Sequence, residues 1–166
     1  MSQIVLSALT PAEAAGPDAV KRTLGDVPNA DVVRDVLAGV IEGQSALYER
    51  TNAMAPWIGY LARDESTNDL VGSCSFIRRA HESSVEIAYF TFPAYEGRGI
   101  ATEMAKGLLA IAQQEGTAQD LHAFTLPEEN ASTAVLRRLG FVQRGTAMDD
   151  EAGVVWRWEL SGQAGL

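Results

Sequence analysis

Residues 86–103 read Glu-Ile-Ala-Tyr-Phe-Thr-Phe-Pro-Ala-Tyr-Glu-Gly-Arg-Gly-Ile-Ala-Thr-Glu, and they combine a strand, a turn and the start of a helix. The β-branched and aromatic residues predict a strand over residues 84–92, and Pro93 has no N–H with which to continue a ladder. Over residues 99–114, apolar residues recur at intervals of three and four, which is the period of an amphipathic helix. The strand therefore enters the helix through a short turn that contains Gly97 and Gly99.

This turn has the properties of an anion site. Gly97 and Gly99 allow a ligand to approach the backbone closely. The first N–H groups of the following helix have no partners within the helix, and the helix dipole adds about half a positive charge there. Arg98 can contribute a full positive charge, so a ligand phosphate is the natural occupant. The alternative is a turn whose two glycines only end a strand and start a helix.

The sequence lacks the motifs of two common classes of phosphate-binding protein. An ATP-binding P-loop needs Gly-Lys-Ser/Thr after four intervening residues, and the chain has none here. A dinucleotide fingerprint needs a third glycine, but Ile100, Ala101 and Thr102 follow Gly99. These absences argue against a P-loop enzyme and against a nicotinamide-dependent enzyme.

The rest of the chain alternates between strand and helix patterns. Residues 57–62, 70–78, 120–126, 141–145 and 154–160 read as strands, residues 31–50 as a helix, and residues 10–29 as a loop or broken helices. Gly39 and Gly43 weaken the helix at 31–50, since each costs about 1 kcal/mol against alanine. Asn130 is a good N-cap for a further short helix. The order of these elements predicts a mixed α/β domain around a partly antiparallel sheet.

Two blocks of sequence resemble the GNAT superfamily of N-acetyltransferases. Glu96-Gly-Arg-Gly-Ile-Ala resembles the family's pyrophosphate loop, Gln/Arg-x-x-Gly-x-Gly/Ala, with Glu96 in place of Gln or Arg. Residues 127–141, which read Pro-Glu-Glu-Asn-Ala-Ser-Thr-Ala-Val-Leu-Arg-Arg-Leu-Gly-Phe, resemble the later block in which an asparagine opens a short helix. Glu86-Ile-Ala-Tyr and Asn130-Ala-Ser are most similar to the ribosomal-protein-alanine acetyltransferase type.

The resemblance implies one acetyl-CoA-binding domain over residues 1–166. The implied fold is a mostly antiparallel sheet of about seven strands, with a splayed central pair and flanking helices. Acetyl-CoA is the implied co-substrate, no metal is required, and pantetheine lies between the splayed strands. The implied cofactor-binding residues are Phe90, Thr91 and Phe92 at the pantetheine amides, Glu96, Gly97, Arg98, Gly99, Ile100, Ala101 and Thr102 at the pyrophosphate, and Asn130 at the pantetheine arm. Because a carboxylate repels a pyrophosphate, we expect the side chain of Glu96 to point away from it.

The implied reaction is direct attack of an amine on the thioester carbonyl. Deprotonating a lysine-like amine of pKa about 10.4 costs roughly 4–5 kcal/mol at pH 7, so a base is valuable. Glu86 is the expected base, acting through a water, because strand alternation places it on one face with Ala88 and Phe90. A structural or solvent contact is the alternative role for Glu86. Ser132 resembles a residue used near the thiol in the similar branch, and a cap or surface position is its alternative. Leu136 stands where many relatives have a tyrosine acid.

Composition excludes several classes of protein. The net charge of -9 argues against nucleic-acid binding and against an anionic membrane surface. The sequence contains no apolar run of about 18 residues, which is the length needed to span a bilayer as a helix. Cys74 is the only cysteine, which suits a reducing compartment, and residues 1–7 lack the features of a signal peptide.

We therefore expect a cytoplasmic enzyme whose partner is a small-molecule amine or a peptide N-terminus. A homodimer is one possible oligomeric state, because domains of the family that the sequence resembles often form dimers. The competing hypothesis is a catalytically weak acetyl-CoA-binding or interaction domain, which Glu96 and Leu136 favour.

Overall fold

The computed structural model describes residues 3–79, 82–115 and 120–160. These residues form seven strands, five α-helices and one 3-10 turn. In chain order they are β1 (Ile4–Leu9), α1 (Pro11–Ala14), α2 (Ala19–Leu24), α3 (Ala30–Thr51), β2 (Gly59–Asp64), β3 (Leu70–Ile77), β4 (Ser84–Thr91), η1 (Pro93–Tyr95), α4 (Ile100–Gln114), β5 (Asp120–Thr125), α5 (Ala131–Arg138), β6 (Val142–Asp149) and β7 (Gly153–Leu160).

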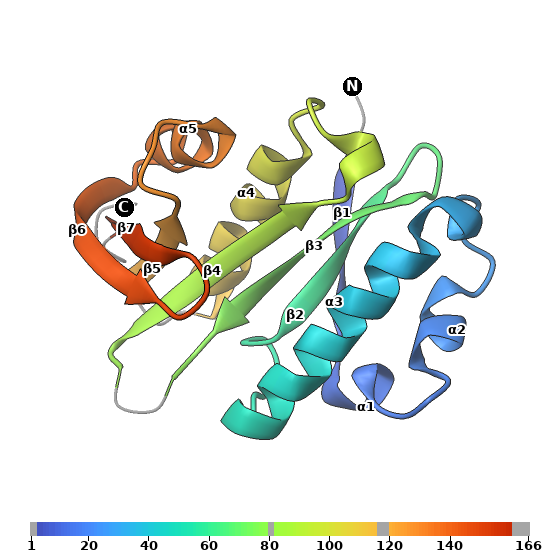
Figure 1. Cartoon of the computed structure of the whole chain (residues 1–166). Helices are drawn as coiled ribbons and strands as arrows, with labels where there is room; N and C mark the ends of the chain where they lie inside the picture. The colour runs from blue at the N-terminus through green and yellow to red at the C-terminus, as the bar shows by residue number, and fades with distance from the viewer. Residues whose placement is uncertain (1–2, 80–81, 116–119, 161–166) are drawn as a thin grey trace.

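All seven strands belong to one sheet, in the order β1-β2-β3-β4-β5-β7-β6. Neighbouring strands are antiparallel except for β4 and β5, which are parallel. The β4–β5 ladder has three register pairs, and the last of them joins Glu86 to His122. Beyond this pair the two strands diverge, and β5, β6 and β7 stand apart from the other strands (Figure 1). The predicted mixed fold with a splayed central pair is therefore confirmed.

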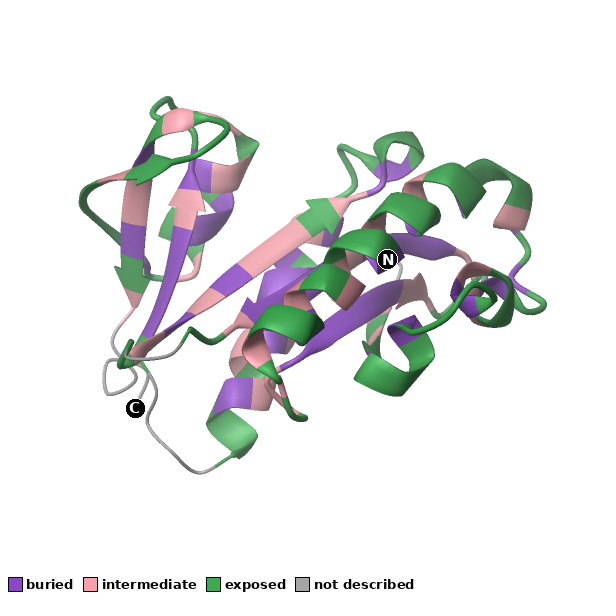
Figure 2. Cartoon of the chain, turned by 60° about the horizontal axis from the view of Figure 1, so that its bottom comes forward, coloured by how far each residue is buried: buried purple, intermediate pink, exposed green. Residues whose placement is uncertain are grey.

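Helices cover the two faces of the first half of the sheet. α3 lies in front of β2 and β3 in Figure 1, with α1 and α2 packed against it, whereas α4 lies behind β3 and β4. The apolar side of α4 is buried at Met104, Ala105, Leu108 and Ala112, which confirms the helical period read from the sequence. Figure 2 shows the same division, with buried positions along the strands and exposed positions on the outer sides of the helices.

Two buried polar side chains connect the first helices to the sheet. The Tyr48 hydroxyl donates to the carbonyl of Leu9 at 2.5 Å and accepts from the N–H of Gly59 at 2.8 Å. The Asn29 amide donates to the carbonyl of Leu70 and to the hydroxyl of Tyr95, each at 2.7 Å, and its oxygen accepts from the Leu70 N–H at 3.0 Å. Asn29 thereby links α3, β3 and the turn after β4.

Several element boundaries differ from those predicted. The strand predicted over 57–62 is β2, which begins at Gly59 and runs on to Asp64 because it pairs with β1 as far as Ile4. The strand predicted over 141–145 is β6, which continues to Asp149. Gly145 does not end this strand: its φ of 84° coincides with a shift in the β6–β7 register, which is a β-bulge.

Candidate active site

The turn between β4 and α4 presents backbone N–H groups at the start of a helix. Gly97 and Gly99 have φ values of 78° and 76°, and Gly99 is the N-cap of α4. This left-handed conformation is strained for residues with a Cβ, and a Cβ at either glycine would meet no atom within 4 Å. The N–H of Glu103 bonds to the carbonyl of Gly99 at 3.2 Å, so the N–H groups of residues 100–102 precede the ladder. The guanidinium of Arg98 lies 5.2 Å from the centre of the Tyr95 ring.

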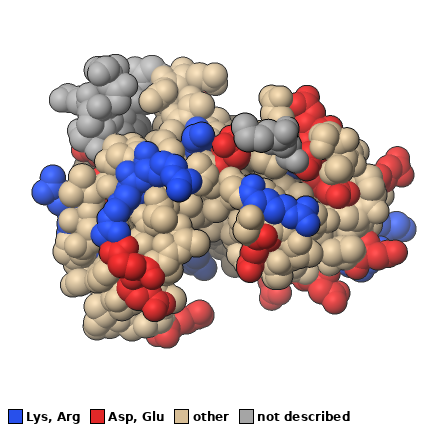
Figure 3. Space-filling model, turned by 90° about the horizontal axis from the view of Figure 1, so that it is seen from above, with Lys and Arg blue, Asp and Glu red and all other residues tan. Residues whose placement is uncertain are grey.

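This turn forms one end of a cleft of about 550 Å³. The cleft lies where β4 and β5 have separated, and α5 forms its opposite wall. Its lining residues are Tyr89, Phe90 and Thr91 of β4, Glu96, Gly97, Gly99, Ile100, Ala101 and Thr102 of the turn and α4, and Ala131, Ser132 and Val135 of α5. Seen from above, the surface is hollowed between two lobes, and each lobe carries Lys or Arg side chains near the hollow (Figure 3). Asp and Glu side chains lie on both lobes in the same view, so the basic side chains are local to the edges of the hollow.

Most of the residues implied to bind the cofactor line this cleft, and three do not. Phe92 is buried, and its N–H donates to the carbonyl of Val71 at 2.9 Å, so that donor is already engaged by β3. Arg98 stacks on Tyr95 beside the cleft. Asn130 is the N-cap residue of α5, and its side chain accepts a hydrogen bond within that cap.

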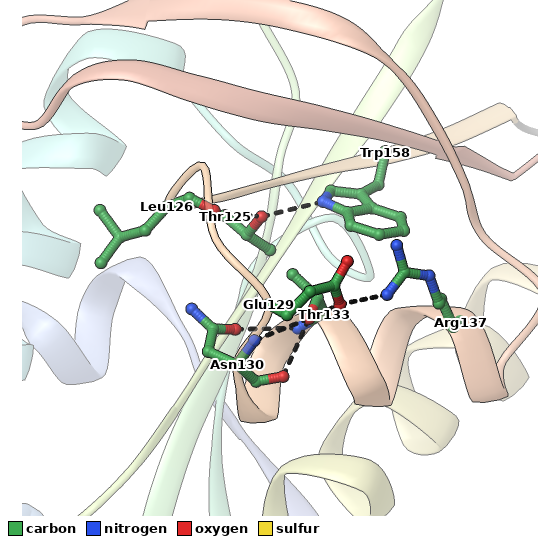
Figure 4. Close-up of polar contacts among 7 residues, drawn as sticks. All are labelled: Thr125, Leu126, Glu129, Asn130, Thr133, Arg137 and Trp158. Carbon is green, nitrogen blue, oxygen red and sulfur yellow. Dashed lines mark hydrogen bonds and ion pairs between the residues drawn. The ribbon is translucent and has the colours of Figure 1, made fainter.

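The N-terminus of α5 is fixed by a reciprocal cap. The side-chain oxygen of Asn130 accepts from the N–H of Thr133 at 3.0 Å, and the N–H of Asn130 donates to the Thr133 hydroxyl at 2.9 Å. Figure 4 shows how this cap continues into a network: the Thr133 hydroxyl donates to Glu129 at 3.1 Å, and Arg137 also donates to Glu129. The Arg137 guanidinium lies 5.0 Å from the Trp158 ring centre, which ties α5 to β7. The predicted N-cap role of Asn130 is confirmed.

Tyr89 spans the cleft from β4 to α5. Its hydroxyl donates to the carbonyl of Ser132 at 3.2 Å. Burial raises the pKa of this phenol to about 12, so it keeps its proton at neutral pH. The sequence motifs by themselves do not single out Tyr89. Alternation along β4 could have placed it on the cleft side, opposite Glu86, but no local pattern could reveal its contact with α5.

Glu86 lies at the point where β4 and β5 separate. Its side chain is 12% exposed, and Oε1 accepts from Nη1 of Arg79 at 2.6 Å. Burial raises the pKa of the Glu86 carboxyl, and the hydrogen bond and charge of Arg79 partly oppose that rise. A carboxyl with a raised pKa is a better proton acceptor near neutral pH than an ordinary glutamate.

His122, the register partner of Glu86, is buried, and only one of its two ring nitrogens forms a hydrogen bond with the described residues. Its Nδ1 shares a hydrogen bond of 2.6 Å with the Ser84 hydroxyl. Among the described residues Nε2 makes no hydrogen bond, and the nearest carboxylate, Glu82, is 3.9 Å away. Burial, followed by the charge of Arg157, lowers the pKa of His122 to about 4, so the ring is neutral at pH 7. No local pattern in the sequence indicates this arrangement.

A second, smaller groove lies on the other side of β4. It has a volume of about 250 Å³ and lies between α3 and the strands β3 and β4. Tyr89 and Phe90 line both this groove and the larger cleft. The arrangement can therefore hold two ligands on the two sides of one strand and let them meet at Tyr89 and Phe90.

Two further properties of the described residues bear on the kind of site this is. Across the described ranges, no three His, Cys, Asp or Glu side chains lie close enough together to hold a metal ion. None of the described helices is long and apolar enough to cross a membrane.

Comparison with known proteins identifies the fold. The family model for an acetyltransferase (GNAT) domain matches residues 7–142. A GNAT-family acetyltransferase from Bacillus anthracis is 17% identical, with a TM-score of 0.64 over 98% of this chain and 99% of that chain. RimL, a ribosomal L7/L12 alpha-N-protein acetyltransferase in complex with coenzyme A, is 18% identical, with a TM-score of 0.64 over 96% of this chain and 94% of that chain. A chimera of spermidine N-acetyltransferase SpeG from Vibrio cholerae and hSSAT is 16% identical, with a TM-score of 0.67 over 98% of each chain. No curated protein matches the chain in sequence.

Proposed function

The chain belongs to the GNAT acetyltransferase family, and on that premise we propose that it transfers an acetyl group from acetyl-CoA to a primary amine. The observation that carries the proposal is the junction of two clefts at β4, where the ladder to β5 stops after Glu86. One cleft has the features of a site for an anionic, extended ligand. The other opens onto the same strand from the opposite face of the sheet.

The larger cleft fits acetyl-CoA. The glycine turn leaves room for a diphosphate beside the N–H groups of residues 100–102. Beyond Glu86, the edge of β4 that faces β5 makes no further ladder pair with β5, so its backbone groups can bind the amides of pantetheine. The Phe92 N–H bonds to Val71, so by alternation the backbone groups of Phe90 also face β3, whereas those of Tyr89 and Thr91 face the open edge. We therefore assign the backbone of Tyr89 and Thr91 and the ring of Phe90 to pantetheine, and residues 97–102 to the pyrophosphate. Acetyl-CoA supplies the acetyl group in activated form, as a thioester.

Glu86 is the proposed general base. It lies where β4 and β5 part, on the sheet face that also carries Ala88 and Phe90. In the transfer a C–N bond forms, the C–S bond breaks, one amine proton passes through water to Glu86, and the thiolate takes up a proton. Ser132 lies in the first turn of α5 on the cleft wall, and we place the departing sulfur beside it.

The acceptor and the compartment are part of the proposal. RimL acts on a protein α-amine and SpeG on spermidine, so the neighbours include enzymes for both kinds of acceptor. We propose a small amine or a peptide N-terminus for this chain, and the cytoplasm as its location. The single Cys74 is buried, and burial raises the pKa of its thiol to about 12, as suits a structural residue rather than a nucleophile.

A second candidate is an acetyl-CoA-binding domain with little catalysis. Two observations favour it. Leu136 is completely buried in α5, so this position offers no phenol to the leaving thiolate. Glu96 is an exposed residue that lines the cleft, and a carboxylate turned toward a diphosphate weakens the attraction for it.

Two measurements on the full chain separate these functions. Titration calorimetry with acetyl-CoA measures binding, and release of free thiol in the presence of single amines measures transfer. We expect binding together with amine-dependent thiol release. Binding without thiol release from any amine would favour the second candidate, and no heat with acetyl-CoA would reject both.

A further inference from the structure

The smaller groove is continuous with the cofactor cleft. Tyr89 and Phe90 line both cavities, so a group in the groove can reach an acyl group in the cleft past β4. This inference rests on the proposed transfer reaction. The groove has a volume of about 250 Å³, and this volume and its lining limit the size and the polarity of the acceptor.

Two glycines on α3 give the groove its width. Gly39 and Gly43 are four residues apart, so they lie on one side of the helix, and both line the groove. Each costs a helix about 1 kcal/mol relative to alanine. Glycines in helices often permit close packing, but a Cβ added at either position would meet no atom within 4 Å. Gly39 and Gly43 instead leave an open volume beside α3, and this volume is part of the groove.

The chemical character of the groove is apolar and uncharged. None of the described residues that line it carries a formal charge. Its polar groups are largely satisfied within the protein: the Gln44 amide donates to the Ser75 hydroxyl at 3.1 Å, and the Tyr60 hydroxyl donates to the carbonyl of Pro56 at 2.7 Å. Phe90, where the groove meets the cleft, is 44% exposed. An apolar ligand would cover this ring, whereas a second ammonium group in the groove would lose water without gaining a counter-charge.

From these observations we propose that the acceptor is a primary amine with one short, uncharged apolar chain. The chain occupies the groove, its amino group is directed toward Glu86, and Gly39 and Gly43 set the room available. The volume is below the roughly 300–1,000 Å³ of pockets for drug-sized ligands, so the chain is short. A polyamine such as the spermidine acted on by SpeG is excluded by the lack of charge in the lining.

A matched pair of amine substrates tests the proposal that the groove accepts only an uncharged chain. n-Pentylamine and cadaverine have the same five-carbon chain, and cadaverine carries a second ammonium group at its far end. We expect kcat/KM for n-pentylamine to exceed that for cadaverine by about ten-fold or more, because a hydrophobic pocket commonly discriminates by about 10–200-fold. Equal or better use of cadaverine would overturn the proposal.

A graded pair of variants tests the role of the glycines. Gly43→Ala and Gly43→Leu both replace glycine by a good helix former, so both should raise thermal stability. Only leucine fills the groove, so Gly43→Leu should raise KM for n-pentylamine by about ten-fold or more, with alanine in between. Asp35→Leu puts the same side chain on an exposed position of α3 outside the groove and serves as the matched control.

Binding of the product gives a readout that does not depend on turnover. In calorimetry, N-pentylacetamide should bind to the wild type and to Asp35→Leu, and more weakly to Gly43→Leu, while all three bind acetyl-CoA equally. If Gly43→Leu binds the amide as tightly as the wild type, the groove is not the acceptor site. If no amine at all supports thiol release, the proposed transfer fails instead, and the two failures are thereby distinguished.

Discussion

Glu86 and His122 form the last register pair before β4 and β5 separate, so their side chains start from one face of the sheet. Both are mostly buried, and burial acts on them in opposite directions. It raises the pKa of the Glu86 carboxyl and lowers the pKa of the His122 imidazole to about 4. Both groups are thus held toward their neutral forms at the place where the proposed chemistry occurs.

Replacing Glu86 by glutamine tests its role as the base. For an amine with a pKa near 10, Glu86→Gln should lower kcat by about 10²–10⁴-fold, the usual contribution of a general base, and leave acetyl-CoA binding unchanged. The wild-type pH–rate profile should lose activity below the raised pKa of Glu86, and the variant should lack that limb. Arg79→Gln supplies the control for position: without the arginine, which lowers the pKa of Glu86, the limb should move to higher pH. Unchanged turnover in Glu86→Gln would leave the residue a structural role only.

His122 should make the folded state sensitive to acid. Its pKa of about 4 lies below the ordinary value of about 6.5, so between these pH values the unfolded chain binds a proton that the folded chain does not. The free energy of unfolding should therefore fall as the pH drops from 6.5 to 4, by on the order of 3 kcal/mol, and be unaffected by this group above pH 7.

The check on His122 is a difference between two chains, since Glu86 has the opposite sign. The raised pKa of Glu86 means that the folded state binds its proton first and gains stability on acidification. Urea unfolding of the wild type and of His122→Gln should show a lower free energy of unfolding for the variant at pH 7, where the bond to Ser84 is weakened, and a smaller loss toward pH 4. Parallel pH dependences in the two proteins would show that His122 does not titrate in this way.

Among the elements, the glycine turn between β4 and α4 depends for its position on contacts from distant segments. The Asn29 amide holds the Tyr95 hydroxyl at 2.7 Å, and the ring of Tyr95 in turn lies under Arg98. α4, which starts at this turn, is fixed on β3 and β4 by fully buried Met104 and Leu108. The N–H groups at its start are therefore held in place before any ligand binds.

Gly99→Val tests the turn, and Gly145→Val is its matched control. Both glycines have positive φ, and a Cβ added at either one would meet no atom within 4 Å, so valine costs each site about 1–3 kcal/mol of backbone strain. Only Gly99 lies in the cleft. Gly99→Val should lose acetyl-CoA binding by calorimetry and Gly145→Val should keep it, and thermal melts should show a similar loss of stability in both variants. Normal binding by a folded Gly99→Val protein would count against the assigned pyrophosphate site.

The elements themselves could largely be predicted from the sequence because their signals are local. The 3.6-residue period of α4, the N-cap Asn130 and the glycine turn are each contained within one segment, and the structure has them where expected. The site depends on contacts between segments, which no local pattern reports. The bond from Tyr89 to Ser132 is of this kind, and so is the Nε2 of His122, which makes no hydrogen bond to the part of the chain that the structure describes. Gly39 and Gly43 were visible only as weak points of a helix, because their meaning depends on the strands that face them.

For the whole molecule, the sheet consists of two parts that share one hydrophobic core but have few hydrogen-bonded links. β1–β4 with α1–α4 form one part, and β5–β7 with α5 form the other. The parts are joined by three β4–β5 register pairs, by contacts of α4 with α5, and by the Tyr89 hydroxyl on the Ser132 carbonyl. The large cleft lies along this boundary, so a ligand that fills it contacts both parts at once.

Acetyl-CoA should therefore stabilise the molecule by bridging the two parts. At 100 times its Kd a ligand adds about 2.7 kcal/mol, which for a domain of this size raises Tm by roughly 5–11 °C. Hydrogen exchange should slow on both sides of the boundary, at residues 89–91 of β4 and 131–135 of α5, as well as at the turn. Inorganic pyrophosphate is the matched probe, since it can occupy only the turn and should slow exchange at residues 97–102 alone. Protection by acetyl-CoA confined to the turn would mean that pantetheine does not lie between the separated strands, because a chain held there cannot leave α5 unaffected.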